Sequence, residues 1–253
     1  IQPDIIVCRS EYPLDNGIKD KIALFCNVPS SHVLQNLDVE YLYEAPLAME
    51  EEHLAQVACE CLGLPCPEPN LSDWKAMCTA LKHPKGEVSV ALVGKYTQLH
   101  DAYISVVESL KHGGIANGVS VNIKWVDSEK VTAENVEEFL GDVSGIIVPG
   151  GFGDRGIEGM IQSIRYAREK KVPFLGLCLG MQLTIVEFTR DVVGYNDAHS
   201  VEFLPGTTHP VIHLMPDQEG IDDIGGTLRL GSYPCILDES SKAYALYGSK
   251  EIH

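Results

Sequence analysis

Between residues 88 and 190 the chain alternates apolar runs of strand length with amphipathic segments of helix length. The expected strands are VSVALVG (88–94), VSVNIKWV (119–126), SGIIVPGG (144–151) and VPFLGLCLG (172–180). Strands buried on both faces and joined by helical crossovers are typical of parallel sheets. The sequence therefore predicts an α/β fold with a doubly wound, mostly parallel sheet.

The residues before this pattern have a different composition. Residues 50–62 carry apolar side chains at helical spacing and are followed by Gly63, which predicts one amphipathic helix with a glycine at its end. Residues 64–87 contain four prolines around one short helix, which is typical of a linker. We therefore predict a first unit over residues 1–63, a linker over 64–87 and a second domain over 88–253.

The charge of the chain excludes two classes of partner. It has 36 acidic and 19 basic side chains, a formal net charge of −17. Nucleic acid and anionic lipid would repel such a chain, so neither is an expected partner. The first residues, IQPDIIVCRS, do not form a secretion signal, and no apolar stretch reaches the roughly 20 residues of a membrane span. We therefore expect a cytoplasmic protein without membrane contact.

The eight cysteines do not form a metal-binding pattern. Cys59, Cys61, Cys66 and Cys78 lack the paired C-x2-C spacing of a structural zinc site. Without a secretion signal we expect reduced thiols that pack as small apolar groups. The sequence predicts no metal site in this chain.

The fragment Gly176-Leu177-Cys178-Leu179-Gly180 is different, because it joins an expected strand to an expected helix. Glycines on both sides allow the sharp turn of a nucleophile elbow, with sulfur in place of oxygen. A thiol at a helix N-terminus is favoured as thiolate, and the N–H of Leu179 would be placed to stabilise an oxyanion. Cys178 is therefore the candidate nucleophile, and a structural cysteine between packing glycines is the alternative.

Residues 149–153, PGGFG, form a second glycine-rich turn after an expected strand. In a doubly wound sheet the turns at the carboxyl ends of the strands line the ligand crevice. The N–H groups of such a turn could supply a second oxyanion donor, or they could bind phosphate.

PGGFG followed by GLCLGMQ resembles the class I glutamine amidotransferases, which hydrolyse glutamine through a cysteine thioester and deliver ammonia to a synthase domain. Longer segments are similar to the CTP synthases within that class: VALVGKYTQLHDAYISVVESLKHGG, VPGGFGDRGIEGMI, PFLGLCLGMQ, DAHSVEF and GGTLRLG, with DIIVCRS and KIALFCNV before the linker. The resemblance runs from residue 1 to residue 253. It implies a flavodoxin-like glutamine amidotransferase domain over residues 88–253, preceded by the C-terminal part of an α/β amidoligase domain over 1–63.

The resemblance implies roles for individual residues of the second domain. Cys178 would be the nucleophile, and Glu202 would accept a hydrogen bond from the α-ammonium group of glutamine, a role that suits a buried carboxylate. Phe152 would be the candidate for packing against GTP as an activator. Glutamine and its oxyanion would be held by Gly151, Leu179, Gly180, Met181 and Gln182.

The first domain would bind nucleotides. By resemblance Lys21 would contact UTP or the inhibitor CTP, and the segment that lines the ATP adenine would be Leu37, Asp38 and Val39. The full-length family converts UTP, ATP and glutamine to CTP with Mg²⁺ as cofactor, and it assembles as a homotetramer. These small molecules are the partners that the resemblance implies.

Three departures from the family pattern bear on activity. The family's phosphate-binding loop and magnesium carboxylates precede residue 1, so we expect no phosphorylation of UTP by this chain. His199 stands where the family usually has the asparagine of DANS. The catalytic His-x-Glu pair lies beyond His253, so we expect that this chain does not turn over glutamine.

His209 is the histidine that most resembles the family's base, because His209-Pro210-Val211 imitates a His-Pro-Glu motif. It lacks the glutamate that would orient its ring. With His213 it has an H-x3-H spacing, but Pro210 disfavours a helix and no third metal ligand is evident. We therefore expect a surface strand residue.

Two alternatives to the glutaminase of a CTP synthase stay open. The second domain could be the glutaminase of another class I amidotransferase, such as that of guanylate or anthranilate synthesis, although KIALFCNV and GGTLRLG weigh against this. It could also be a non-catalytic, amidotransferase-like binding domain, which would require an unreactive Cys178.

Overall fold

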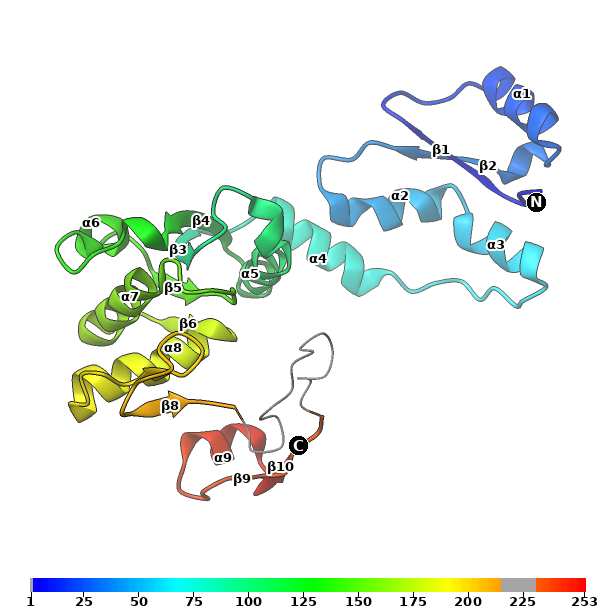
Figure 1. The fold of residues 1–253 in the computed structure, drawn as a ribbon. Coiled ribbons are helices and arrows are strands. Elements are labelled where there is room, and N and C mark those ends of the chain that lie inside the picture. The colour runs from blue at the N-terminus through cyan, green and yellow to red at the C-terminus, as the bar shows by residue number, and fades with distance from the viewer. Residues whose placement is uncertain (1, 215–230) are drawn as a thin grey trace.

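In a computed structural model the chain is described over residues 2–214 and 231–253 (Figure 1). The GGTLRLG segment used for the family resemblance therefore lies outside the described residues, except for Gly231. No helix in the described ranges has the length and apolar character that a bilayer span requires.

A four-stranded parallel sheet confirms the fold class expected from the alternating pattern. Its strands lie in the order β4-β3-β5-β6, and every neighbouring pair is parallel. The chain therefore reverses its direction of travel across the sheet between β4 and β5, and such a reversal opens a crevice at the carboxyl ends of the central strands. The bounds are β3 Glu87–Gly94, β4 Ser120–Asp127, β5 Gly145–Val148 and β6 Phe174–Gly176.

Helices cover both faces of this sheet, as a doubly wound fold requires. Figure 1 shows α5 on one side and α6, α7 and α8 on the other. Ala91 and Val148 lie in one buried cluster with Leu183 of α8, whereas the alternating Leu92 and Ile147 are buried on the opposite face. The helices are α5 Ile104–Asn117, α6 Val136–Leu140, α7 Ile157–Lys170 and α8 Leu179–Phe188.

The last expected strand is shorter and more exposed than the apolar run 172–180 predicts. β6 has three residues, and the side chain of Leu175 is 52% exposed. Among the described residues β6 is an edge strand of this sheet, and its one neighbouring strand is β5. The prediction of a buried strand is wrong for this residue.

Shorter elements connect and follow the sheet. β7 and β8 pair in parallel, and β9 and β10 pair antiparallel. These elements are η3 His100–Tyr103, η4 Ser128–Lys130, η5 Thr189–Val193, β7 His199–Ser200, β8 Pro210–Ile212, β9 Cys235–Ile236, α9 Lys242–Tyr247 and β10 Glu251–Ile252.

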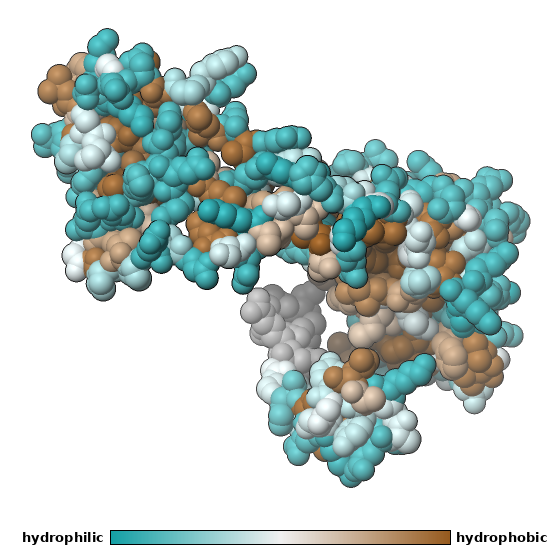
Figure 2. All heavy atoms as spheres, turned by 180° about the vertical axis from the view of Figure 1, so that it is seen from behind, coloured by the Kyte–Doolittle hydropathy of each residue, from teal (hydrophilic) through white to brown (hydrophobic). Residues whose placement is uncertain are grey.

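The N-terminal part has a two-stranded parallel sheet of β1 and β2 with helices around it. Figure 2 shows it as a separate mass, joined to the α/β part through a narrow waist. Its elements, with the linker helix α4, are β1 Ile6–Ser10, α1 Asn16–Cys26, η1 Ser30–His32, β2 Val33–Leu37, η2 Leu42–Glu44, α2 Ala45–Glu51, α3 Leu54–Leu62 and α4 Ser72–Lys82.

The single helix predicted over residues 50–62 is wrong, because the chain breaks between α2 and α3. His53 has a positive φ of 59°, which ends α2. The preceding carboxylate, Glu52, accepts hydrogen bonds from the backbone and side chain of Gln35 and pairs with Lys19 at 3.0 Å. These contacts to β2 and α1 oppose a continuous helix at this point.

Candidate active site

The backbone at Cys178 has the geometry of a nucleophile elbow. Cys178 has φ 52° and ψ −105°, is solvent-exposed and forms the N-cap of α8. A non-glycine residue with such a φ is strained, and strained backbone is a recurring feature of catalytic turns. A Cβ on Gly180 would lie 2.0 Å from the carbonyl oxygen of Val148, so only glycine fits at that position. The first turn of α8 can therefore pack directly against β5 and present the thiol at the edge of the sheet.

The PGGFG turn lies directly against this thiol. A Cβ built on Gly150 would be 3.4 Å from the Cβ of Cys178 and 3.9 Å from its sulfur. One built on Gly151 would lie 3.7 Å from the side chain of Leu179. Both follow from the neighbouring positions of β5 and β6. The structure thus brings together the two turns that the sequence singled out separately.

Lys95, a buried lysine directly after β3, holds the PGGFG turn through its side chain. Its side chain donates from Nζ to the carbonyl of Phe152 at 3.1 Å and also to the carbonyl of Gly153. Lys95 is only 4% exposed, and its Nζ lies 5.9 Å from the ring centre of Phe203. Burial lowers the pKa of the Lys95 ammonium, and Asp154 and Glu202 partly oppose that shift.

Tyr103 fixes the backbone of Lys95. Its hydroxyl accepts hydrogen bonds from the N–H groups of Lys95 at 3.1 Å and of Tyr96 at 3.3 Å. Tyr103 is 5% exposed, and burial raises the pKa of its phenol. Sequence reasoning missed Lys95 and Tyr103. The available signal was a lysine directly after the strand VSVALVG, at the carboxyl end of the sheet.

The other residues proposed for glutamine lie around the elbow with different burial. Leu179 and Gly180 are buried in the first turn of α8, and Gln182 is half-buried. Met181 is 53% exposed. Phe152 is 86% exposed at the tip of its turn, which fits an aromatic side chain available to a ligand.

Glu202 is exposed rather than buried. It follows β7, next to the Phe203 ring that faces Lys95. A buried carboxylate would suit the recognition of an ammonium group, but Glu202 is not buried in this structure. The resemblance alone now supports the role of Glu202.

His209 has the carboxylate partner that the sequence analysis denied it. Its Nδ1 lies 2.6 Å from Oδ1 of Asp197, and its ring stacks on Tyr195 with centroids 4.2 Å apart. Hydrogen bonds from Thr208 and from His209 lower the pKa of Asp197. The missing-partner argument is therefore wrong, because the partner comes from a loop twelve residues earlier rather than from the His-Pro motif.

His199, the departure from the family motif, is a buried residue. It is 8% exposed, and its Nδ1 accepts from the N–H of Ser200 at 2.9 Å. Burial is the main reason that the pKa of His199 is lowered, and Arg190 adds to the effect.

The predicted nucleotide residues lie in the N-terminal part and are not brought to the elbow. Lys21 is an exposed residue of α1. Leu37 ends β2, and Asp38 pairs with Arg9 at 2.9 Å. Val39 follows as a half-buried residue.

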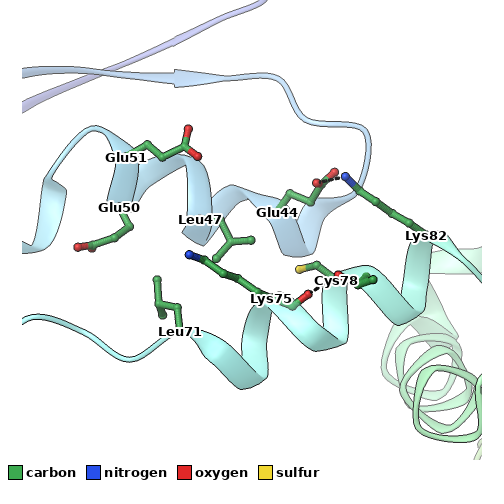
Figure 3. Close-up of a pocket in the computed structure, with 9 residues that line it drawn as sticks. Glu44, Leu47, Glu50, Glu51, Leu71, Lys75, Cys78 and Lys82 are labelled. Atoms are coloured by element: carbon green, nitrogen blue, oxygen red, sulfur yellow. Dashed lines mark hydrogen bonds and ion pairs between the residues drawn. The ribbon is translucent and has the colours of Figure 1, made fainter.

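A groove of about 370 Å³ between α2 and α4 contains none of the predicted site residues (Figure 3). Burial raises the pKa of the Cys78 thiol that faces it. Among residues 2–214 and 231–253 no three His, Cys, Asp or Glu side chains form a group suited to a metal ion.

Comparison with known proteins agrees with this geometry. Residues 98–252 match the family described as Glutamine amidotransferase class-I, and residues 1–64 match the one described as CTP synthase N-terminus. The CTP synthases of Clostridium acetobutylicum and Caldanaerobacter subterraneus are 55% and 53% identical over all 253 residues. Each match covers 47% of the relative, so the chain spans about half the length of the curated relatives it matches.

A solved structure is also similar to this chain. The glutaminase domain of Trypanosoma brucei CTPS with bound acivicin is 36% identical, with a TM-score of 0.55 over 65% of this chain and 64% of that one. The elbow, the glycine turn against it and these matches agree. The chain therefore belongs to the class I glutamine amidotransferase family, and over its whole length it is similar to CTP synthases.

Proposed function

We propose that this chain carries the glutamine-hydrolysing, ammonia-supplying part of a CTP synthase, with Cys178 as the nucleophile. The observation that carries the proposal is the strained, exposed Cys178 at the N-terminus of α8, with the PGGFG turn directly against it. A Cβ built on Gly150 of that turn would lie 3.4 Å from the Cβ of Cys178 and 3.9 Å from its sulfur. A thiol held between two sets of backbone N–H groups suits acyl transfer through an oxyanion.

In the proposed reaction the Cys178 thiolate attacks the amide carbon of glutamine, and the C–N bond breaks to release ammonia. The resulting thioester is cleaved by water to give glutamate and the free thiol. The N–H groups of Leu179 and Gly151 are the proposed donors to the oxyanion of each step. Lys95 holds the carbonyls of Phe152 and Gly153, which fixes the backbone of the turn that carries the proposed donor Gly151.

Both steps need a base that removes and returns a proton. No His-x-Glu pair occurs in the 253 residues, so the family's base has no counterpart among them. Glu202 is proposed to meet the α-ammonium of glutamine, and Gly180, Met181 and Gln182 to border its side chain.

For the full-length protein we propose CTP formation from UTP, ATP and ammonia in a cytoplasmic homotetramer. The proposed boundaries are 1–63 for the amidoligase part, 64–87 for the linker and 88–253 for the glutaminase domain. Lys21 would contact UTP or CTP, and Leu37, Asp38 and Val39 would line the adenine. The described residues hold no group that fits a metal ion, so no step of this proposal runs through Mg²⁺.

We also propose that GTP activates the full-length enzyme beside the PGGFG turn, where Phe152 is 86% exposed. In the full-length protein Phe152→Ala should lose GTP activation of glutamine-dependent synthesis and keep ammonia-dependent synthesis. Retained GTP activation in this variant would overturn the assignment.

Covalent labelling of this chain tests the glutaminase assignment. Acivicin should add to Cys178 alone among the eight cysteines, and glutamine should slow the addition. Cys178→Ala should abolish labelling, whereas Cys66→Ala, which removes another exposed thiol, should leave it unchanged. Iodoacetamide labelling spread evenly over Cys59, Cys66 and Cys178 would instead indicate a non-catalytic binding domain.

Glutamate release tests the position of the base. A chain extended to include a downstream His-x-Glu should exceed this chain by on the order of 10⁴-fold, the usual effect of a missing catalytic base. Turnover by this chain within about tenfold of the extended one, lost in both Cys178→Ala and His209→Ala, would show that the His209–Asp197 pair is the base.

A further inference from the structure

The side chain of Tyr43 joins the N-terminal part to the α/β part. Its hydroxyl donates to a carboxylate oxygen of Glu108 and lies 2.6 Å from Nε2 of His112, both on α5. Within the described residues, these are the hydrogen bonds that connect residues 2–62 with residues 88–214. The hydroxyl donates to the carboxylate, so it is left to accept from the imidazole.

The backbone of the same residue is anchored to the linker helix. The carbonyl of Tyr43 accepts from Nε1 of Trp74 at 2.7 Å and from the thiol of Cys78 at 3.3 Å, both on α4. The next residue, Glu44, forms an ion pair with Lys82 at the end of α4 (Figure 3). Figure 1 shows α4 between the two parts. The backbone of Tyr43 therefore holds η2 against α4. The hydroxyl of the same residue connects η2 and α4 to α5.

The ring of Tyr43 has space to move once its hydroxyl is released. Cavities of about 510 and 540 Å³ are both lined by Tyr43. The nearest aromatic rings, Trp74 and His112, have centroids 6.2 and 5.4 Å away and meet it edge-on. The hydrogen bonds of the hydroxyl therefore restrain the orientation of a ring that has open space beside it. The hydrogen bond to Glu108 raises the pKa of Tyr43 to about 12, so the phenol keeps its proton at neutral pH.

Helix α5 leads from this contact to the glutaminase site. Glu108 is five residues after Tyr103, about 7.5 Å along a helix. Tyr103 accepts from the N–H groups of Lys95 and Tyr96, and the Lys95 ammonium holds the PGGFG turn. In the other direction along the chain, Tyr43 follows closely after the proposed adenine segment, residues 37–39.

We propose that Tyr43 is a positioning residue that transmits the placement of the nucleotide segment to the glycine turn beside Cys178. Through this contact, the release of ammonia at Cys178 is coupled to the consumption of ammonia in the N-terminal part of the enzyme. The proposal rests on the proposed function, but its first test does not require catalysis.

The first test is amide hydrogen exchange in this chain. Tyr43→Phe removes the hydroxyl and keeps the ring. The amides of Lys95 and Tyr96 should then exchange at least about fivefold faster, because α5 and Tyr103 lose a restraint. Tyr41→Phe is the matched control, since Tyr41 lines the same 540 Å³ cavity. Unchanged exchange at Lys95 and Tyr96 in a folded Tyr43→Phe chain overturns the proposal.

The second test is the ratio of CTP formed to glutamate released by the full-length enzyme. Tyr43→Phe should lower this ratio by at least about twofold while ammonia-dependent CTP formation is unchanged. Glu108→Ala, which removes the acceptor of the Tyr43 hydroxyl, should do the same, and the double variant should add little, because both changes break one contact. If Tyr43→Phe impairs folding, Glu108→Ala alone decides. An unchanged ratio overturns the coupling role, whereas a wild-type enzyme that releases no glutamate contradicts the proposed function instead.

Discussion

The N-terminal and α/β regions of this chain differ in how much of their own surface they bury. An apolar cluster extends from Ala91 to Val186 across the strands and helices of the α/β region. In residues 2–62 the buried apolar side chains are Ala23, Val33, Leu34 and Val57, while Leu24 and Phe25 of α1 are 78% and 87% exposed. A sheet of two strands has too little area for an independent core, whereas four strands with helices on both faces have enough.

This difference bears on where precise chemistry can be placed. The strained φ of Cys178 persists only where its surroundings are rigid. Cys178 lies between β6 and α8, and the next residue, Leu179, belongs to that cluster. The predicted nucleotide residues lie instead on exposed or half-buried positions of the N-terminal part. The contact of Tyr43 with α5 would be one way to order that part.

The largest expected effect is that of adding a side chain at Gly180 in the α/β part. Gly180→Ala would place a methyl group 2.0 Å from the carbonyl oxygen of Val148, so strand and helix must separate. We expect a loss of about 4 kcal/mol or more in the free energy of unfolding and no labelling of Cys178 by acivicin. Denaturant unfolding and intact mass measure the two effects.

Gly113→Ala is the matched control for this variant. Gly113 is an exposed residue of α5, and a Cβ there meets no atom within 4 Å. This change should stabilise the chain by up to about 1 kcal/mol through helix propensity. Equal stability of the two glycine variants would contradict the close packing of α8 on β5.

Truncating an apolar side chain in each region tests the comparison itself. Leu183 is fully buried, so Leu183→Ala should lower the free energy of unfolding by about 2–5 kcal/mol. Phe25 is 87% exposed, so Phe25→Ala should change it by less than about 0.5 kcal/mol in this chain. A large loss for Phe25→Ala would show that the N-terminal part buries α1 against a surface of its own.

The parallel sheet and the elbow were predictable because their signals are local. Apolar runs mark buried strands, and glycines on both sides of Cys178 mark a sharp turn whatever the distant residues are. The break at His53 was not predictable in this way. It depends on contacts of Glu52 with Lys19 and Gln35, which are distant in sequence.

The supporting residues of the site were missed for the same reason. A lysine at the end of a strand is usually solvated, whereas Lys95 is buried against the PGGFG turn and near the ring of Phe203. The partner of His209 was sought within the His-Pro motif, but the loop that carries Asp197 supplies it. Tertiary contacts decide both cases, and a single sequence does not contain them explicitly.

A smaller effect than the core changes is expected for Lys95→Met, which removes the ammonium and keeps the stem. Without its hydrogen bonds to Phe152 and Gly153 the glycine turn should lose its orientation. We expect acivicin labelling of Cys178 to slow by about 10–100-fold, in line with the loss of one oxyanion donor. Iodoacetamide, which needs no oxyanion donor, should label Cys178 at nearly the wild-type rate. Equal slowing of both reagents would mean that Lys95 acts on the thiol and not on the turn.

The smallest expected effect compares a surface carboxylate from each region, Asp197 and Asp38. Hydrogen bonds from Thr208 and then His209 hold the pKa of Asp197 below its ordinary value, so the folded chain binds its proton less readily than the unfolded chain does. The stability this carboxylate contributes is therefore present above its ordinary pKa and is lost as the pH falls toward the lower value in the folded chain. Asp197→Asn should lower the denaturant midpoint at neutral pH, and the gap from wild type should close through the acid range. Asp38 makes an exposed ion pair with Arg9 at 2.9 Å, and Asp38→Asn should leave the midpoint within error at every pH because such pairs contribute little. A gap for Asp197→Asn that stays constant with pH would show that the asparagine disturbs the loop itself, and the charge of Asp197 would then have no part in holding His209 against Tyr195.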